Sequence, residues 1–185
     1  MGSQGSGKGT QAKRISAEYG IPHVATGDLY RAAVAAGTEL GRSVEPILAE
    51  GRLVPDEITI PLIREELLKT ADGFVLDGFP RNLAQAEALD GLLEELGRPL
   101  SIVLLLELSD DIARERLLRR ARLEGRADDT PEAIDERLAT YHEKTQPVVD
   151  HYLATGNLVK VHAERLVEEV WDEIVKALEQ VEARA

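Results

Sequence analysis

Residues 2–10 read GSQGSGKGT and match the pattern G-x-x-x-x-G-K, in which two glycines bracket four residues and a lysine follows. Glycines let successive backbone N–H groups turn into one hollow the size of a phosphate, and a helix that starts there adds the positive end of its dipole. Lys8 is then placed for the β- and γ-phosphates of a nucleotide, and Thr10 for a Mg²⁺ ion or its water shell. Gly9 stands where the pattern usually carries Ser or Thr. The alternative is a flexible glycine-rich tail, but the helical pattern after Lys8 favours the loop.

Strand-like and helical segments alternate along the rest of the chain. Short apolar runs bounded by turn residues indicate strands, and apolar residues at helical spacing between Gly and Pro breaks indicate helices. This alternation predicts an α/β fold, a mostly parallel sheet flanked by helices on both faces. We expect strands at 21–26, 73–80, 101–108 and 157–163, and helices at 9–20, 27–37, 43–51, 56–70, 83–97, 110–124, 131–151 and 167–181.

Composition excludes several classes of protein. The chain has 185 residues, of which 43% are hydrophobic, enough for one domain with a sizeable core. The absence of cysteine excludes disulfides and thiolate zinc sites and is compatible with a reducing compartment. No apolar run approaches the roughly 20 residues that span a bilayer, so we expect a cytoplasmic protein without a membrane partner. The net charge of −12 argues against nucleic acid as a partner.

Positive charge is nevertheless concentrated in one segment. The stretch RERLLRRARLEGR, residues 114–126, carries arginine at 114, 116, 119, 120, 122 and 126. Taken alone, this segment is typical of a solvated helix face. Beside a phosphate loop, it indicates a cluster that binds anions on an otherwise acidic protein.

The stretch LDGFPR, residues 76–81, is a second candidate for chemistry. A strand that delivers Asp77 at its carboxyl end places an acid where it can organise Mg²⁺ through water. Arg81 follows Pro80, whose ring restricts the backbone, and such a turn can aim a bidentate donor at an anionic substrate. The structural alternative is an ordinary Asp-Gly turn.

In order and spacing, these motifs resemble the adenylate kinase family, in the short-lid form found in bacteria. The resemblance runs through almost the whole chain. It rests on the loop at 2–10, ATGD at 25–28 with Arg31, DGFPR at 77–81 with Gln85, the arginines of 114–126, and RADD at 126–129 with Arg137.

The resemblance implies a role for each matching residue. For ATP binding these are Gly5, Ser6, Gly7, Lys8, Gly9, Thr10, Arg116, Arg120 and Arg165. For AMP binding they are Thr26, Arg31, Arg52, Leu53, Val54, Gly78, Phe79, Pro80, Arg81, Gln85, Arg126 and Arg137. The implied catalytic residues are Lys8, Arg81, Arg116, Arg120, Arg126 and Arg137. Thr10 and Asp77 would hold Mg²⁺ through water, and no zinc is expected. Around Arg165 the sequence HAERLVEE lacks the Asp-Gly turn that is commoner in the family.

The implied activity is transfer of the γ-phosphoryl group of ATP to AMP, which gives two ADP. A kinase for UMP or CMP is the alternative, although Thr26 and Gln85 resemble the AMP-specific members.

The implied fold is a P-loop NTPase-type core in a single, monomeric domain of residues 1–185. Its core comprises 1–24, 55–119 and 131–185, with an AMP-binding helical insertion at 25–54 and a short lid at 120–130.

One element of the family pattern is missing. Family members begin with a short apolar strand at the centre of the sheet that runs directly into the phosphate loop, and only Met1 precedes the loop here. Without that strand, ladder groups on both neighbouring strands would lack partners, at a cost of several kcal/mol. We expect Met1 to be an internal methionine of a longer protein. The alternatives are an enzyme that lacks the strand, or a truncated form that binds nucleotide with weak or no catalysis.

Overall fold

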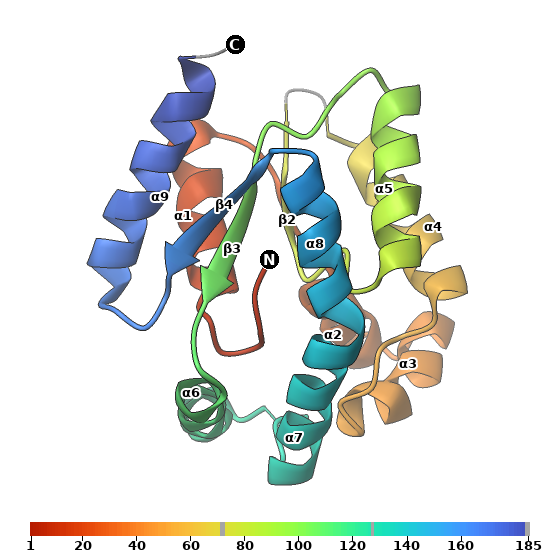
Figure 1. Cartoon of the computed structure of the whole chain (residues 1–185). Coiled ribbons are helices and arrows are strands. Elements are labelled where there is room, and N and C mark those ends of the chain that lie inside the picture. The colour runs from red at the N-terminus through yellow and green to blue at the C-terminus, as the bar shows by residue number, and fades with distance from the viewer. Residues whose placement is uncertain (71–72, 127, 184–185) are drawn as a thin grey trace.

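A computed structural model describes residues 1–70, 73–126 and 128–183 and confirms the α/β fold (Figure 1). Helices lie on both sides of short parallel strands, and the carboxyl end of β3 points toward α6. The elements in chain order are α1 (Lys8–Tyr19), β1 (His23–Ala25), α2 (Thr26–Ala35), α3 (Glu39–Ala49), α4 (Asp56–Leu68), β2 (Val75–Asp77), α5 (Leu83–Glu95), β3 (Val103–Glu107), α6 (Asp110–Glu124), α7 (Pro131–Thr140), the π-helical turn η1 (Tyr141–Thr145), α8 (Gln146–Ala154), β4 (Leu158–His162) and α9 (Val167–Glu182).

The strands form two parallel pairs rather than one continuous ladder within the described residues. β1 pairs with β2, with Ala25 opposite Asp77, and β3 pairs with β4, with Glu107 opposite His162. Met1 runs beside β3: its amino group donates to the carbonyl of Leu104, and the N–H of Leu106 donates to the Met1 carbonyl at 3.0 Å. Part of the edge of β3 is therefore satisfied by the residue just before the phosphate loop.

Apolar clusters pack against the strands, and one of them joins the two pairs, since Val75 of β2 packs against the cluster that contains Val161 of β4. Val24 of β1 packs in a cluster with Ile63 and Leu67 of α4 and Leu89 of α5. The β4 residue Val161 packs with residues of α1 and α9, among them Ile15, Val170 and Ile174. These clusters fix the ends of the strands, where the phosphate loop and the arginines gather.

The helix ends follow the turn residues of the sequence, with two differences. Gly20 ends α1 at a φ of 66°, and Asn82 caps α5 by accepting a hydrogen bond from the N–H of Gln85. The helix expected at 131–151 is interrupted by η1, so α7 and α8 are separate helices joined by one π-helical turn. The helix expected at 43–51 begins earlier, at Glu39, because the Thr38 side chain caps it by accepting a hydrogen bond from the N–H of Gly41. The helix α6 ends at Glu124 as expected and includes the first residues of the expected lid at 120–130, of which residue 127 lies outside the described residues.

None of the helices in the described part of the chain is both long and apolar enough to cross a membrane.

Candidate active site

The phosphate loop closes on itself before α1 begins. Gly5 and Gly7 adopt φ angles of 85° and 87°, which L side chains rarely adopt. A Cβ atom on Gly5 would lie 2.7 Å from the carbonyl oxygen of Ala113, so the loop passes directly against α6. The loop ends at Lys8, the first residue of α1, whose unpaired N–H groups form an anion site.

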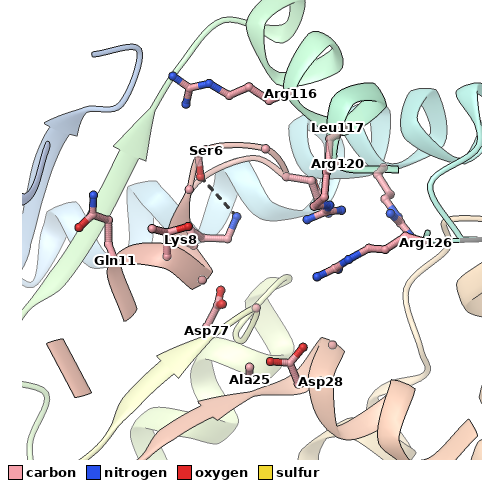
Figure 2. Close-up of a pocket in the computed structure, with 18 of the residues that line it drawn as sticks. Ser6, Lys8, Gln11, Ala25, Asp28, Asp77, Arg116, Leu117, Arg120 and Arg126 are labelled. Atoms are coloured by element: carbon pink, nitrogen blue, oxygen red, sulfur yellow. Dashed lines mark hydrogen bonds between the residues drawn. The ribbon is translucent and has the colours of Figure 1, made fainter. Parts of the chain in front are cut away.

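Lys8 folds back over the loop that precedes it. Its Nζ atom donates to the carbonyl oxygens of Gly2 at 2.8 Å and Ser3 at 2.7 Å, and lies 3.5 Å from Ser6 Oγ (Figure 2). Burial lowers the pKa of Lys8 to about 8, and the nearby Arg81 and Arg120 act in the same direction, against the attraction of Asp77. A bound anion would therefore stabilise the charged form of the Lys8 ammonium group.

Asp77 ends β2 and faces the start of α1. Its Oδ2 atom lies 3.5 Å from His23 Nε2 and 3.3 Å from the position that a Cβ on Gly9 would occupy. Burial alone would raise the pKa of Asp77, but His23 and the positive charge of Lys8 hold it below its usual value. The carboxylate is thus ionised beside the residues that follow the phosphate loop, as a Mg²⁺-organising acid must be.

A hydrogen-bonded turn at 78–85 forms the opposite wall of the site. Thr26 Oγ1 donates to the carbonyl oxygen of Gly78 at 3.0 Å, and Arg81 Nε donates to the same oxygen at 2.7 Å. The N–H of Arg81 donates to Gln85 Oε1 at 2.8 Å. Burial lowers the pKa of Arg81, with Asp77 opposing and Arg137 adding to the effect. A buried guanidinium group of this kind is available to an anionic ligand.

Acidic residues after α6 hold two of the arginines. Arg120 donates from Nε and Nη2 to Asp129 at 2.8 and 2.9 Å. Arg137 also pairs with Asp129, and its Nη2 atom donates to Asp128 at 2.8 Å. Hydrogen bonding to Arg137 holds the pKa of Asp128 below its usual value, although burial alone would raise it. Figure 2 shows Arg120 on the side of the cavity that faces Lys8.

One large cavity connects these groups. Its volume is about 960 Å³. Of the residues predicted from the sequence, it is lined by Gly5, Ser6, Gly7, Lys8, Gly9, Thr10, Thr26, Arg31, Arg52, Leu53, Val54, Asp77, Gly78, Arg81, Gln85, Arg116, Arg120, Arg126, Arg137 and Arg165. A phosphate loop and an arginine-lined pocket thus open into a single space.

Comparisons with known proteins agree with this arrangement. The family model described as adenylate kinase matches residues 1–157. An adenylate kinase of Synechococcus sp. (strain RCC307) is 49% identical over 178 residues, and one of Xylella fastidiosa (strain 9a5c) is 47% identical over 180 residues. An adenylate kinase of Stenotrophomonas maltophilia (strain R551-3) is 44% identical over 180 residues. Each match covers 96% of both chains.

The chain belongs to the adenylate kinase family.

Two residues that the resemblance to adenylate kinases assigned to AMP lie elsewhere. The side chain of Phe79 is buried in the core cluster with Ile63 and Leu67, and Pro80, joined to Phe79 by a cis peptide bond, is buried as well. Neither is among the described residues that line the cavity. Their contribution to the wall comes through the turn that places Gly78 and Arg81.

Three predicted arginines make ion pairs or backbone contacts of their own. Arg126 Nε donates to Glu124 at 2.6 Å, Arg165 pairs with Glu173, and Arg116 Nη1 donates to the carbonyl oxygen of Ala163 at 2.8 Å. All three line the cavity at its α6 side or along the segment after β4. To present these particular N–H groups to a nucleotide phosphate, Arg126 and Arg165 would have to exchange these partners.

Sequence reasoning missed several polar residues of the site. Tyr30 and Thr59 line the cavity and share a hydrogen bond of 2.7 Å between their hydroxyl groups. Asp56 accepts a hydrogen bond from Gln85 Nε2 at 2.7 Å. Asp56 follows Pro55 in the first turn of α4, where the helix dipole already accounts for an acidic residue. The signal that it serves a site is its long-range contact with α5, which no local pattern contains.

Proposed function

We propose that this protein is an ATP:AMP phosphotransferase, which transfers the γ-phosphoryl group of ATP to AMP and forms two ADP. The observation that carries the proposal is the single cavity, with the phosphate loop and Lys8 on one wall and the turn of Gly78 and Arg81 on the other. The names of the relatives, at 44–49% identity over nearly the whole chain, support the same activity. Neither the comparisons nor the site favours a kinase for UMP or CMP.

Phosphoryl transfer requires that the two nucleotides be correctly positioned and that positive charge surround the transferring group, rather than a general base. A phosphate oxygen of AMP, already ionised at neutral pH, forms a bond to the γ-phosphorus while the bond from that phosphorus to the β,γ-bridging oxygen breaks. Charge on the equatorial oxygens is stabilised by Lys8 from the loop side and by Arg81, Arg116, Arg120, Arg126 and Arg137 from the other walls. The bridging oxygen leaves with its electron pair on the β-phosphate of the ADP product.

We assign the two nucleotides to the two walls. ATP occupies the loop of residues 5–10 together with Arg116, Arg120 and Arg165. AMP occupies the wall formed by Thr26, Arg31, residues 52–54, Gly78, Phe79, Pro80, Arg81 and Gln85, with Arg126 and Arg137 at its phosphate. Phe79 and Pro80 act through the turn that they support, because their side chains are buried away from the cavity.

We infer that the chain has one core and two parts that close over it. The core comprises residues 1–24, 55–119 and 131–185, the AMP-binding insertion comprises 25–54, and the short lid comprises 120–130. Closure of both parts would exclude water, the competing acceptor, and bring the arginines together. The pairing of Arg120 and Arg137 with Asp129 links the lid to α7.

Adenylate kinases generally use Mg²⁺ with ATP, and the residues present fit an ion that arrives on the nucleotide. Among residues 1–70, 73–126 and 128–183, no three His, Asp or Glu side chains form a metal cluster. The ionised Asp77 beside the start of α1 suits an acid that orients the water shell of the ion, and Thr10 lines the same cavity. When bound, the ion would neutralise charge on the β- and γ-phosphates.

A coupled assay of ADP formation tests the proposal directly. ATP and Mg²⁺ are supplied with AMP, UMP or CMP, and initial rates are measured with and without excess chelator. We expect rapid turnover with AMP, little with UMP or CMP, and loss of turnover on chelation. Binding of ATP without ADP formation would identify instead the truncated, non-catalytic form. A preference for UMP or CMP would overturn the assignment of substrate.

The monomeric state and the cytoplasmic location remain predictions. Light scattering during gel filtration should give a mass near the 20.3 kDa of one chain. A mass of two chains would contradict the first prediction.

A further inference from the structure

Two neighbours hold the side-chain amide of Gln85 in one orientation. Gln85 Oε1 accepts from the backbone N–H of Arg81 at 2.8 Å, and Gln85 Nε2 donates to Asp56 Oδ1 at 2.7 Å. Turning the amide by 180° would set its NH₂ group against the N–H of Arg81 and its oxygen against the carboxylate of Asp56. Both contacts would then be repulsive, so the donor end and the acceptor end of the amide cannot exchange.

Asp56 is itself fixed at the junction of two helices. It is the first residue of α4, where the helix dipole favours a negative charge. Asn82 Nδ2 lies 3.0 and 3.1 Å from its two carboxylate oxygens, and Asn82 Oδ1 accepts from the N–H of Gln85 at 2.8 Å. Asp56, Asn82 and Gln85 therefore close a ring of hydrogen bonds, which includes the backbone N–H of Gln85, between the first turns of α4 and α5.

The amide of Gln85 keeps capacity for a ligand. An amide side chain has two N–H donors and two acceptor lone pairs, and Asp56 and Arg81 use one of each. Gln85 is 2% exposed and lines the cavity, so one donor and one acceptor remain at its wall. This donor and acceptor pair has a fixed direction, because the amide cannot turn.

Such a fixed pair distinguishes two purines of the same size. Adenine presents the donor N6 amino group beside the acceptor N1, whereas hypoxanthine presents the acceptor O6 beside the donor N1–H. A freely turning amide could match either base. A fixed amide forms both hydrogen bonds with one of the two bases. With the other base, donor faces donor and acceptor faces acceptor, which leaves buried polar groups unpaired.

We propose that Asp56 is the positioning residue for base selection in the monophosphate site: by fixing the direction of the Gln85 amide, it selects the 6-aminopurine of AMP against the 6-oxopurine of IMP. The inference rests on the proposed function, because it takes the base of AMP to lie against Gln85. It deepens that function by assigning the discrimination to a carboxylate that need not touch the substrate.

The experiment compares kcat/KM for AMP and for IMP, with ATP saturating, in the wild type and three variants. The wild type should prefer AMP by more than about a hundredfold. Asp56→Ala should reduce that ratio about tenfold or more, mainly because kcat/KM for IMP rises. Asp56→Asn should restore most of the ratio, because its carbonyl oxygen can accept the same hydrogen bond from Gln85. Glu57→Ala is the matched control, since it removes an exposed acid from the same helical turn and should leave the ratio unchanged.

The outcomes separate the inference from the proposed function. If the wild type forms no ADP from AMP, the proposed function itself is wrong. If the wild type uses AMP but accepts IMP within a few fold, the amide is not fixed and the inference fails, a result that needs no folded variant. If Asp56→Ala lowers both rates equally and keeps the wild-type ratio, Asp56 has only a structural role and the inference is overturned.

Discussion

The carboxylate of Asp129 receives Nε and Nη2 of Arg120 side by side, at 2.8 and 2.9 Å. The same carboxylate pairs with Arg137, and its side chain is completely buried. A planar guanidinium group that meets a carboxylate in this way can meet a phosphate with the same two donors. Asp129 therefore anchors Arg120 and Arg137 beside the cavity, and Nε and Nη2 of Arg120 would have to leave it before they could bind a phosphate.

Replacing Asp129 by alanine should destabilise the protein. Loss of the buried carboxylate removes one of the two acids that pair with Arg137, itself 9% exposed, and leaves Asp128 as its ionic partner, so we expect the free energy of unfolding to fall by about 3 kcal/mol. Asp135→Ala is the control, because its ion pair with Arg114 is exposed and is worth less than about 1 kcal/mol. Urea unfolding followed by circular dichroism gives both values. Equal unfolding midpoints for the two variants would contradict the prediction.

Arg81→Ala and Arg120→Ala should each lower kcat by about 10³, because an arginine at the transferring group stabilises charge that develops in the transition state. The loss of stability should be modest, so both variants should remain folded at the assay temperature. Steady-state kinetics and thermal melting separate these effects. Arg64→Ala, which breaks an exposed pair with Glu95, should have normal turnover. Near-normal turnover in both site variants would refute the assignment of these arginines.

ATP affinity should fall as the pH rises through about 8. The pKa of Lys8 in the free protein is lowered to about 8, so above that pH the ammonium group loses its proton and its attraction for phosphate. Below that pH the group is charged and the affinity is at its plateau. Calorimetric titration of ATP between pH 7 and 9.5 should show this decline in the wild type. In Lys8→Met we expect weak binding that does not change over the same range, and a parallel decline in that variant would assign the titration to another group.

The same pKa predicts a change in stability with the opposite sign. The unfolded chain keeps the ordinary lysine pKa of 10.5, so between about 8 and 10.5 it binds a proton that the folded protein does not. The contribution of Lys8 to the free energy of unfolding should therefore rise with pH across this window. The difference in urea midpoint between the wild type and Lys8→Met, measured at pH 7.5 and pH 9.5, should shift in favour of the wild type at the higher pH.

The AMP-binding insertion should depend on the close approach of α2 and α3 at Gly41. A Cβ atom there would lie 2.1 Å from the carbonyl oxygen of Ala33, inside the backbone of α2. Gly41→Ala should therefore destabilise the insertion by about 2 kcal/mol or more. It should also raise KM for AMP by a larger factor than KM for ATP. Gly91→Ala in α5 is the matched control, because no atom lies within 4 Å of its added Cβ. That variant should be as stable as the wild type, or up to about 1 kcal/mol more stable.

Much of the fold was predictable because its signals are local. Gly20 ends α1, the acids after Pro55 begin α4, and the apolar run at 101–108 contains β3. Each depends on a few adjacent residues whose backbone preferences agree with the final structure. The phosphate loop was predictable for a different reason, since phosphate binding demands particular residue types at fixed spacing. The opposite wall, with Thr26, Arg31 and Gln85, was predicted from the resemblance to adenylate kinases.

What escaped prediction depends on contacts between distant residues. The break at η1 has no Gly, and the only proline nearby comes after the turn. Thr145, its last residue, donates instead to the carbonyl oxygen of Arg81 at 2.8 Å. The role of Asp56 required knowledge that α4 and α5 begin side by side. The division of the strands into two pairs likewise reflects tertiary packing that the strand-like pattern of each segment does not encode.

The phosphate loop connects the edge of β3 to helix α1. Met1, just before the loop, is hydrogen-bonded to β3, whereas α1, which the loop enters, packs against β1 and β2 and, through Ile15, against Val161 of β4. The loop thus connects the edge of β3 to a helix that contacts both strand pairs, and it lies between Asp77 at the end of β2 and α6, which follows β3. Any shift of α1 relative to β3 would change the shape of the loop, so the packing of α1 against both strand pairs also sets the geometry in which the loop can bind a phosphate.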